Sequence, residues 1–117
     1  PKVMSIENPG VIDSMGISKV DERAVLLISD HLDWADEASH FELFEQKISK
    51  YLDFIKSGQL LEALPRAKDR PIRIELVQQH KPTENALRFL NSAKQQLAEM
   101  ALEFTYHPLP AGYLRPS

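Results

Sequence analysis

The first regular pattern in the chain is a pair of short apolar runs. Residues 11–17 (VIDSMGI) and 24–29 (AVLLIS) are separated by the mostly polar stretch 18–23, so they predict two strands joined as a hairpin. Gly16 weakens the first of these strands. Residues 1–10 (PKVMSIENPG) hold few apolar residues among Pro, Asn and Gly, and we expect them to form a flexible N-terminal arm.

Two later segments have the spacing of amphipathic helices. The first begins at about Asp36, and Gly58 follows it where a left-handed C-cap belongs. Pro82 opens the second, because a missing N–H costs nothing in the first turn of a helix. The expected buried positions are Phe41, Phe44, Ile48, Tyr51, Leu52 and Ile55 in the first helix, and Ala86, Leu90, Ala93, Leu97 and Met100 in the second.

Strict alternation of apolar and polar residues marks two further strands, at 72–76 (IRIEL) and 102–106 (LEFTY). A short helical turn is expected at 59–64, before a polar loop at 65–71. The order β-β-α-β-α-β predicts an α+β fold, a two-layer α/β sandwich in which a mixed four-stranded sheet carries two helices on one face. We expect a single domain at 11–107, followed by a flexible Pro-rich tail at 108–117.

Composition narrows the class of protein. The chain is 43% hydrophobic and 26% charged, which is ordinary for a globular domain. Its net charge of −3 disfavours nucleic acid as a partner, because phosphates attract a basic face. The sequence contains no cysteine, which excludes thiol nucleophiles and thiolate zinc sites. With neither an apolar run long enough to cross a bilayer nor a signal-peptide pattern, we expect a cytoplasmic protein without a membrane partner.

The densest group of chemically active side chains lies between the second strand and the first helix. This segment (29–40, SDHLDWADEASH) supplies the candidate binding residues Asp30, His31, Asp33, Trp34, Glu37 and His40. Strand ends of this kind often bind ligands in open α/β sheets, and carboxylates with imidazoles suit a metal ion or acid–base chemistry. The same acids also suit the first helical turn, where Asp33 or Asp36 can cap free N–H groups. We favour capping, and we assign no catalytic residue, metal ligand or cofactor.

Glu37 and Trp34 call for separate interpretations. A helical projection places Glu37 within the apolar stripe, so its carboxylate needs a partner, and His31 is the nearest candidate along the chain. The alternative is that Glu37 reaches water at an open helix end. Trp34 is the only tryptophan, and we expect it to anchor the start of the first helix, with a ligand or partner contact as the alternative.

Three segments resemble a family of small, uncharacterised bacterial proteins, a domain family of unknown function. The likeness lies in residues 29–34 (SDHLDW), 57–60 (SGQL) and 82–90 (PTENALRFL), and it extends over about residues 11–107. This resemblance implies a bacterial origin and a single-domain fold. It implies no activity, substrate, cofactor or catalytic residue.

We interpret the chain as a non-enzymatic interaction module, such as a regulatory or immunity-type protein that binds another protein or itself. The alternative is a metal-dependent or acid–base enzyme centred on Asp30, His31, Asp33 and Glu37. The two hypotheses differ in whether these side chains converge on one concave site or turn to local backbone groups.

The second strand adds a prediction about self-association. Residues 24–28 (AVLLI) are apolar at every position, although helices on one face of a sheet leave the other face uncovered. Either Val25 and Leu27 or Leu26 and Ile28 therefore lack cover. This predicts a homodimer through the sheet face, unless the N-terminal arm or the tail folds over it.

Overall fold

The sheet is built on the predicted hairpin. The computed structural model describes residues 5–108, in which β1 (Ser14–Ile17) pairs antiparallel with β2 (Ala24–Asp30). β1 begins at Ser14 rather than at Val11, because the preceding Asp13 has other partners. The Asp13 N–H donates to the Tyr51 hydroxyl (3.0 Å) instead of joining the ladder. The hairpin is therefore confirmed, with a shorter first strand.

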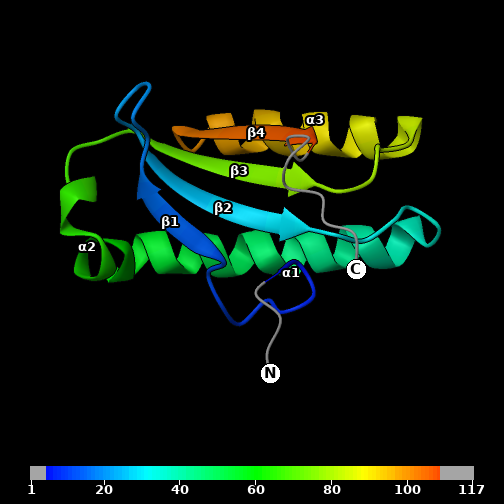
Figure 1. Ribbon diagram of the computed structural model, residues 1–117, viewed down its shortest axis with the longest axis horizontal. Coiled ribbons are helices and arrows are strands. Elements are labelled where there is room, and N and C mark those ends of the chain that lie inside the picture. Colours follow the sequence, from blue (N-terminus) through cyan, green and yellow to red (C-terminus); the bar gives the residue numbers. More distant parts are fainter. Residues whose placement is uncertain (1–4, 109–117) are drawn as a thin grey trace.

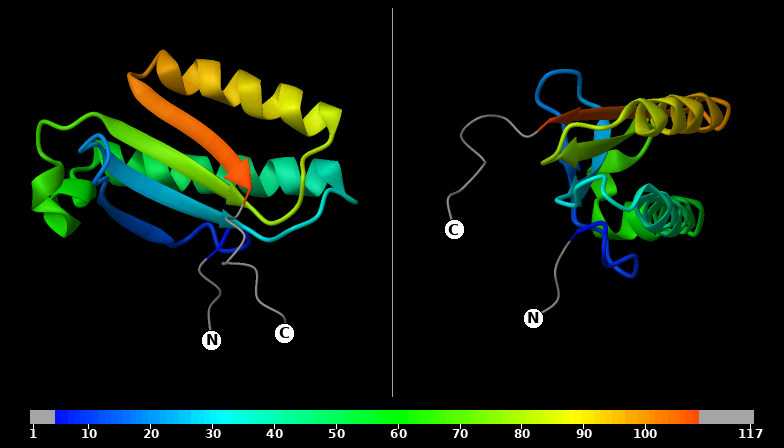
Figure 2. Two further views of the ribbon diagram at one scale, coloured as in Figure 1. Left: turned by 45° about the horizontal axis from the view of Figure 1, so that its top comes forward. Right: turned by 90° about the vertical axis from the view of Figure 1, so that its right-hand side faces the viewer.

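Two parallel strands complete the sheet. β3 (Ile72–Gln78) lies between β2 and β4 (Leu102–Pro108), which gives the strand order β1-β2-β3-β4. The crossovers are α1 (Glu37–Lys56) and α3 (Glu84–Ala98), and both lie on the same face of the sheet (Figures 1 and 2). The short α2 (Gln59–Ala63) and a 3-10 turn at Pro65–Ala67 follow α1. The predicted α+β class and mixed four-stranded sheet are confirmed.

Both long helices begin at capping residues. Asp36 and Thr83 each accept a hydrogen bond from the backbone N–H three residues later, at 3.1 Å. Pro82 therefore precedes the cap of α3 instead of standing in its first turn, which corrects our expectation. After α1, Gly58 has a φ of 88°, the left-handed conformation that glycine adopts without strain.

Burial alternates along β2 and so decides which side chains face the helices. Leu26 and Ile28 are fully buried beneath α1 and α3, whereas Val25 and Leu27 are half-buried on the opposite face. The same core includes Phe44, Tyr51, Leu60, Ile74, Leu76, Leu90, Leu97 and Phe104. Of the two sets that the sequence left open, Val25 and Leu27 are the ones that the helices do not cover.

The start of the described chain is packed rather than loose. Ile6 is fully buried, and its N–H donates to the carbonyl oxygen of Ser29 at 2.9 Å. Our expectation of a flexible arm is thus wrong for residues 5–10. Composition suggested an arm because few residues there are apolar, but the partners of this backbone lie far along the chain. Residues 1–4 and 109–117, which include nearly all of the predicted tail, lie outside the described residues.

Candidate functional site

A buried ion pair joins the end of β2 to the start of α1. His40 Nε2 lies 2.6 Å from Asp30 Oδ2, and the two side chains are 2% and 1% exposed. The other ring nitrogen, Nδ1, lies 3.0 Å from the carbonyl oxygen of Asp33. Because a carbonyl oxygen only accepts, Nδ1 carries a proton. The short contact between His40 Nε2 and Asp30 Oδ2 therefore leaves both nitrogens of the ring engaged.

The surroundings of this pair hold it in place and close it off. Asp30 Oδ1 accepts the N–H of Leu32 at 3.1 Å, which fixes the orientation of the carboxyl group. Trp34 stacks on the His40 ring, with centroids 3.6 Å apart and planes 13° apart. Trp34 thus packs against the start of α1, as expected of an anchor. A general acid or base must come within hydrogen-bond reach of its substrate, whereas this pair is already engaged on both sides.

Asp33 and Asp36 serve local backbone groups. Asp33 Oδ1 accepts the N–H of Ala35 at 3.0 Å, and Asp36 caps α1. Both aspartates are exposed. The capping interpretation is confirmed for Asp36, and within residues 5–108 no group of three or more His, Asp or Glu side chains is arranged to hold a metal ion.

Glu37 and His31 do not pair with each other, which corrects the expectation that His31 is the partner of the Glu37 carboxylate. Glu37 accepts hydrogen bonds from the Thr83 hydroxyl and from the Asn85 side-chain amide, both at the start of α3. His31 Nε2 instead lies 2.8 Å from Glu7 Oε1, with both side chains largely exposed. The two helices begin at the same edge of the sheet, so Glu37 meets residues that are distant along the chain (Figure 1).

Two buried N–H groups near the ion pair have no hydrogen-bond partner among the described residues. They are Trp34 Nε1 and Gln78 Nε2. Gln78 is 3% exposed and stands beside Asp30 in the parallel ladder. A buried donor without an acceptor costs about 1–3 kcal/mol. The carboxyl ends of β2 and β3 are therefore a place where polar packing is incomplete.

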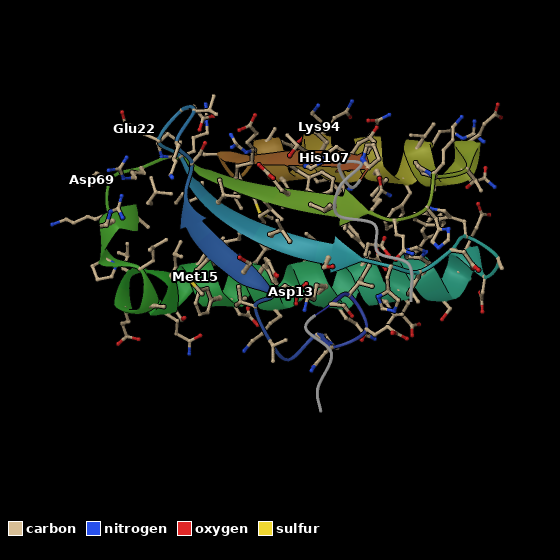
Figure 3. All side chains as sticks on the ribbon, viewed as in Figure 1. Asp13, Met15, Glu22, Asp69, Lys94 and His107 are labelled. Atoms are coloured by element: carbon tan, nitrogen blue, oxygen red, sulfur yellow. The ribbon has the colours of Figure 1, made fainter. Side chains whose placement is uncertain are left out.

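A second buried cluster, which our sequence interpretation missed, surrounds Lys47 of α1. Its Nζ donates to the carbonyl oxygens of Asn8 (2.7 Å) and Val11 (2.8 Å) and to Asp13 Oδ1 (2.7 Å). Lys47 is 0% and Asp13 3% exposed, and Asp13 lies next to α1 just before β1 (Figure 3). All three ammonium protons are thus satisfied, and the cluster pins residues 8–13 to the helix.

Tyr51 extends this cluster by one helical turn. Its hydroxyl donates to the carbonyl oxygen of Leu27 at 2.5 Å and accepts the N–H of Asp13. Burial raises the pKa of Tyr51 well above its ordinary value, so the hydroxyl stays protonated and keeps its donor role. A lysine in the same row as Phe44 and Tyr51, at the i+3 and i−4 spacings, was the sequence signal for this site.

The open face of the sheet carries a network of charges. Arg73 donates to Asp21 (2.6 Å), Glu75 (2.9 Å) and Glu103 (3.3 Å). Burial alone would lower the pKa of Arg73, but these carboxylates raise it above its usual range. The hydrogen bond from Arg73 in turn lowers the pKa of Asp21 to about 2. The face opposite the helices is therefore charged at Arg73, Glu75 and Glu103, and apolar at Val25 and Leu27 of β2 and at the buried Val77 of β3.

A groove of about 250 Å³ lies between α1 and α3 on the helix layer. Its apolar walls include Phe44, Ile48 and Leu52 from α1, and Phe89, Ala93 and Met100 from α3 and its end. Met100 is 49% exposed, which corrects its expected place in the buried stripe. The two helices therefore present apolar side chains to each other without filling the space between them.

Comparison with known proteins places the chain in a family. The model of a family of unknown function, DUF6572, matches residues 4–110. The chain belongs to this family. No curated protein and no solved structure matches the DUF6572 chain. The expected resemblance to a family of unknown function is confirmed, while a bacterial source stays a prediction.

The DUF6572 fold thus divides the six candidate residues into two groups. It brings Asp30, Trp34 and His40 together, because the half-buried Trp34 stacks on the buried Asp30–His40 pair. The other three, Asp33, Glu37 and His31, take separate partners.

Within the described residues no helix has the length and apolar character needed to cross a membrane.

Proposed function

We propose that this DUF6572 protein is a non-enzymatic interaction module, of a regulatory or immunity type, that binds another protein through the groove between α1 and α3. The rotation of α1 is the observation that carries this proposal. The core buries the row His40, Phe44, Lys47 and Tyr51, of which two are polar. The predicted apolar stripe shares Phe44 and Tyr51 with this row, but its centre lies roughly 60° further round the helix at 3.6 residues per turn.

The consequence is that α1 turns part of its apolar stripe away from the sheet. Ile48 and Leu52 are only half-buried and line the groove on the α1 side, and Ala93 lines it on the α3 side. Full burial of an exposed isoleucine or leucine side chain contributes about 1.5–3 kcal/mol, so completing the burial of a half-buried one contributes roughly half of that. α1 places Lys47 and His40 in the core and leaves Ile48 and Leu52 half-exposed. It therefore has apolar surface available for a partner.

The alternative enzyme would use the Asp30–Glu37 segment as its centre. Its groups would have to converge on a cavity that a substrate can enter. Their contacts support the module instead, because the Asp30–His40 pair is 1–2% exposed and Glu37 is bonded to Thr83 and Asn85.

A matched pair of variants tests the proposal. Ala93→Phe fills the groove, whereas Ala98→Phe makes the same change at an exposed position of α3 outside the groove lining. Each protein is immobilised, and partners from an extract of the source organism are compared by quantitative mass spectrometry. The proposal expects at least one protein that wild type and Ala98→Phe retain and Ala93→Phe loses. If the three profiles coincide while all three proteins are folded, the groove is not the binding surface.

Self-association through the open sheet face is a second candidate, supported by Val25 and Leu27. They are half-buried on the face of the sheet opposite α1 and α3. Light scattering coupled to size exclusion at micromolar concentration should then give a dimer for the wild type and a monomer for Leu27→Asp. Leu61→Asp makes the same change at a position of α2 that is 45% exposed and lies outside the sheet, and this matched control should remain a dimer. A monomeric wild type removes this candidate.

A further inference from the structure

We infer that the groove takes an amphipathic helix of the partner with basic residues along its flanks. This inference rests on the proposed function and adds the class of partner. The α1 wall runs from Phe44 to Leu52, about 12 Å at 1.5 Å per residue. A bound helix presents anchors at i, i+3 or i+4 and i+7, which span about 10.5 Å. The groove therefore matches one face of a two-turn helical segment.

The shape of the groove favours side chains over a compact small ligand. Its volume of about 250 Å³ lies below the range of roughly 300–1,000 Å³ that is usual for pockets of drug-sized molecules. One end is closed by Phe41 and Phe89, whose rings stack 4.2 Å apart and bridge the two helices. Met100 stands at the other end, where a flexible thioether can adapt to the shape of an incoming side chain.

The charges around the groove select for a basic partner. Glu45 is the charged residue of the lining and is exposed. Glu42 lies one turn before it on α1, and Glu99 ends α3, where the helix dipole adds negative partial charge. The nearby cations Lys56, Arg88 and Lys94 lie outside the lining, and Arg88 is held by Asn85 at 2.7 Å. The other polar lining residues are neutral: Ser49, Ser92 and Gln96. Lysine or arginine beside the anchors would therefore meet Glu45, the charged residue within the lining itself.

Two model peptides test the class of partner without knowledge of the natural one. One is an amphipathic helix of about 14 residues made of Leu and Lys, and the other has the same pattern of Leu and Glu. Binding is measured by titration calorimetry against wild type, Ala93→Phe, Ala98→Phe and Glu45→Lys. We expect wild type to bind the Leu/Lys peptide about ten-fold or more tightly than the Leu/Glu peptide. Ala93→Phe should weaken binding of the Leu/Lys peptide by about ten-fold, and Ala98→Phe should leave it unchanged.

Further variants separate groove binding from attraction to an acidic protein. Glu45→Lys should abolish the preference for the Leu/Lys peptide. Met100→Asp serves if Ala93→Phe fails to fold, because Met100 is 49% exposed and follows the helix. Equal binding of the Leu/Lys peptide to wild type and to a folded groove variant would overturn the inference, since binding would then be electrostatic only. Two results would overturn the basic-helix class and leave the proposed function standing. The first is tighter binding of the Leu/Glu peptide. The second is that neither peptide binds, although the extract experiment finds a protein that wild type retains and Ala93→Phe loses.

Discussion

Replacing Lys47 by methionine should destabilise the protein more than any surface substitution. The change keeps most of the side-chain volume but removes all three hydrogen bonds from Nζ, at 2.7–2.8 Å, to Asn8, Val11 and Asp13. It also leaves the Asp13 carboxylate, 3% exposed, without its counter-ion. Removing one partner of a buried pair costs about 3–5 kcal/mol, a large part of the roughly 5–15 kcal/mol that stabilises a typical domain.

Urea unfolding followed by circular dichroism measures this loss. We expect Lys47→Met to lower the free energy of unfolding by about 3–5 kcal/mol and Tm by about 12–20 °C. Lys50→Met is the matched control, because it makes the same change one turn away at a half-exposed position, and it should stay within about 0.5 kcal/mol of wild type.

A double-mutant cycle isolates the ionic part of the effect. Asp13→Asn removes the negative charge and retains an oxygen that can accept the Ser29 N–H, now bonded to Asp13 at 2.9 Å. In combination with Lys47→Met it should cost less than the sum of the single changes, with a coupling of about 1–3 kcal/mol. A loss below about 1 kcal/mol for Lys47→Met, or full additivity in the cycle, would refute the assignment of Lys47 as the clamp of residues 8–13.

Four further expectations concern the remaining polar sites. Asp36→Ala removes the cap of α1 and should lower stability by about 0.5–2 kcal/mol in thermal melts, whereas Mg²⁺, Mn²⁺ or Zn²⁺ should not raise the Tm of wild type. Gln78→Met removes a buried, unpartnered amide and should raise stability by about 1 kcal/mol in urea, and a clear loss would mean that the amide is satisfied. Because the pKa of Asp21 is lowered to about 2, its interaction with Arg73 stabilises the fold above the unfolded pKa, and this stabilisation is lost as pH falls through about 2. NMR titration of the Asp21 carboxyl group should give a midpoint near pH 2, and a midpoint at the ordinary value for aspartate would show that the pair does not form in solution. Trp34 stacks on His40, so its fluorescence should be blue-shifted, and emission like that of free tryptophan would place it in water.

The fold could be predicted because its signals are local. Alternation at 72–76 and 102–106 and the three-to-four spacing after Asp36 each depend on neighbouring residues, and the strands and helices formed where these patterns lie. The capping role of Asp36 is equally local, since its hydrogen bond reaches only three residues along the chain.

The sites that sequence reasoning missed depend on distant contacts. Lys47 is buried because Asp13, 34 residues away, supplies its counter-charge, and its burial rotates α1 away from the orientation that the apolar stripe alone predicts. Glu37 likewise bonds to Thr83, 46 residues later, rather than to the nearby His31. A helical projection ranks faces by hydrophobicity, and it has no term for a charge that is neutralised by a remote partner.

The burial of Lys47 also changes how its amine reacts. An acylating reagent needs a free, unprotonated and accessible amine, and this Nζ has all its protons engaged and no exposed surface. Lysines 19, 68 and 81 are exposed and will be labelled in the native protein. Lys47 acquires a label only when the segment that covers it opens. The rate at which its mass shift appears therefore measures how often residues 8–13 separate from α1. The Lys47 amine thus reports on this local opening in the native sequence, without any engineered probe.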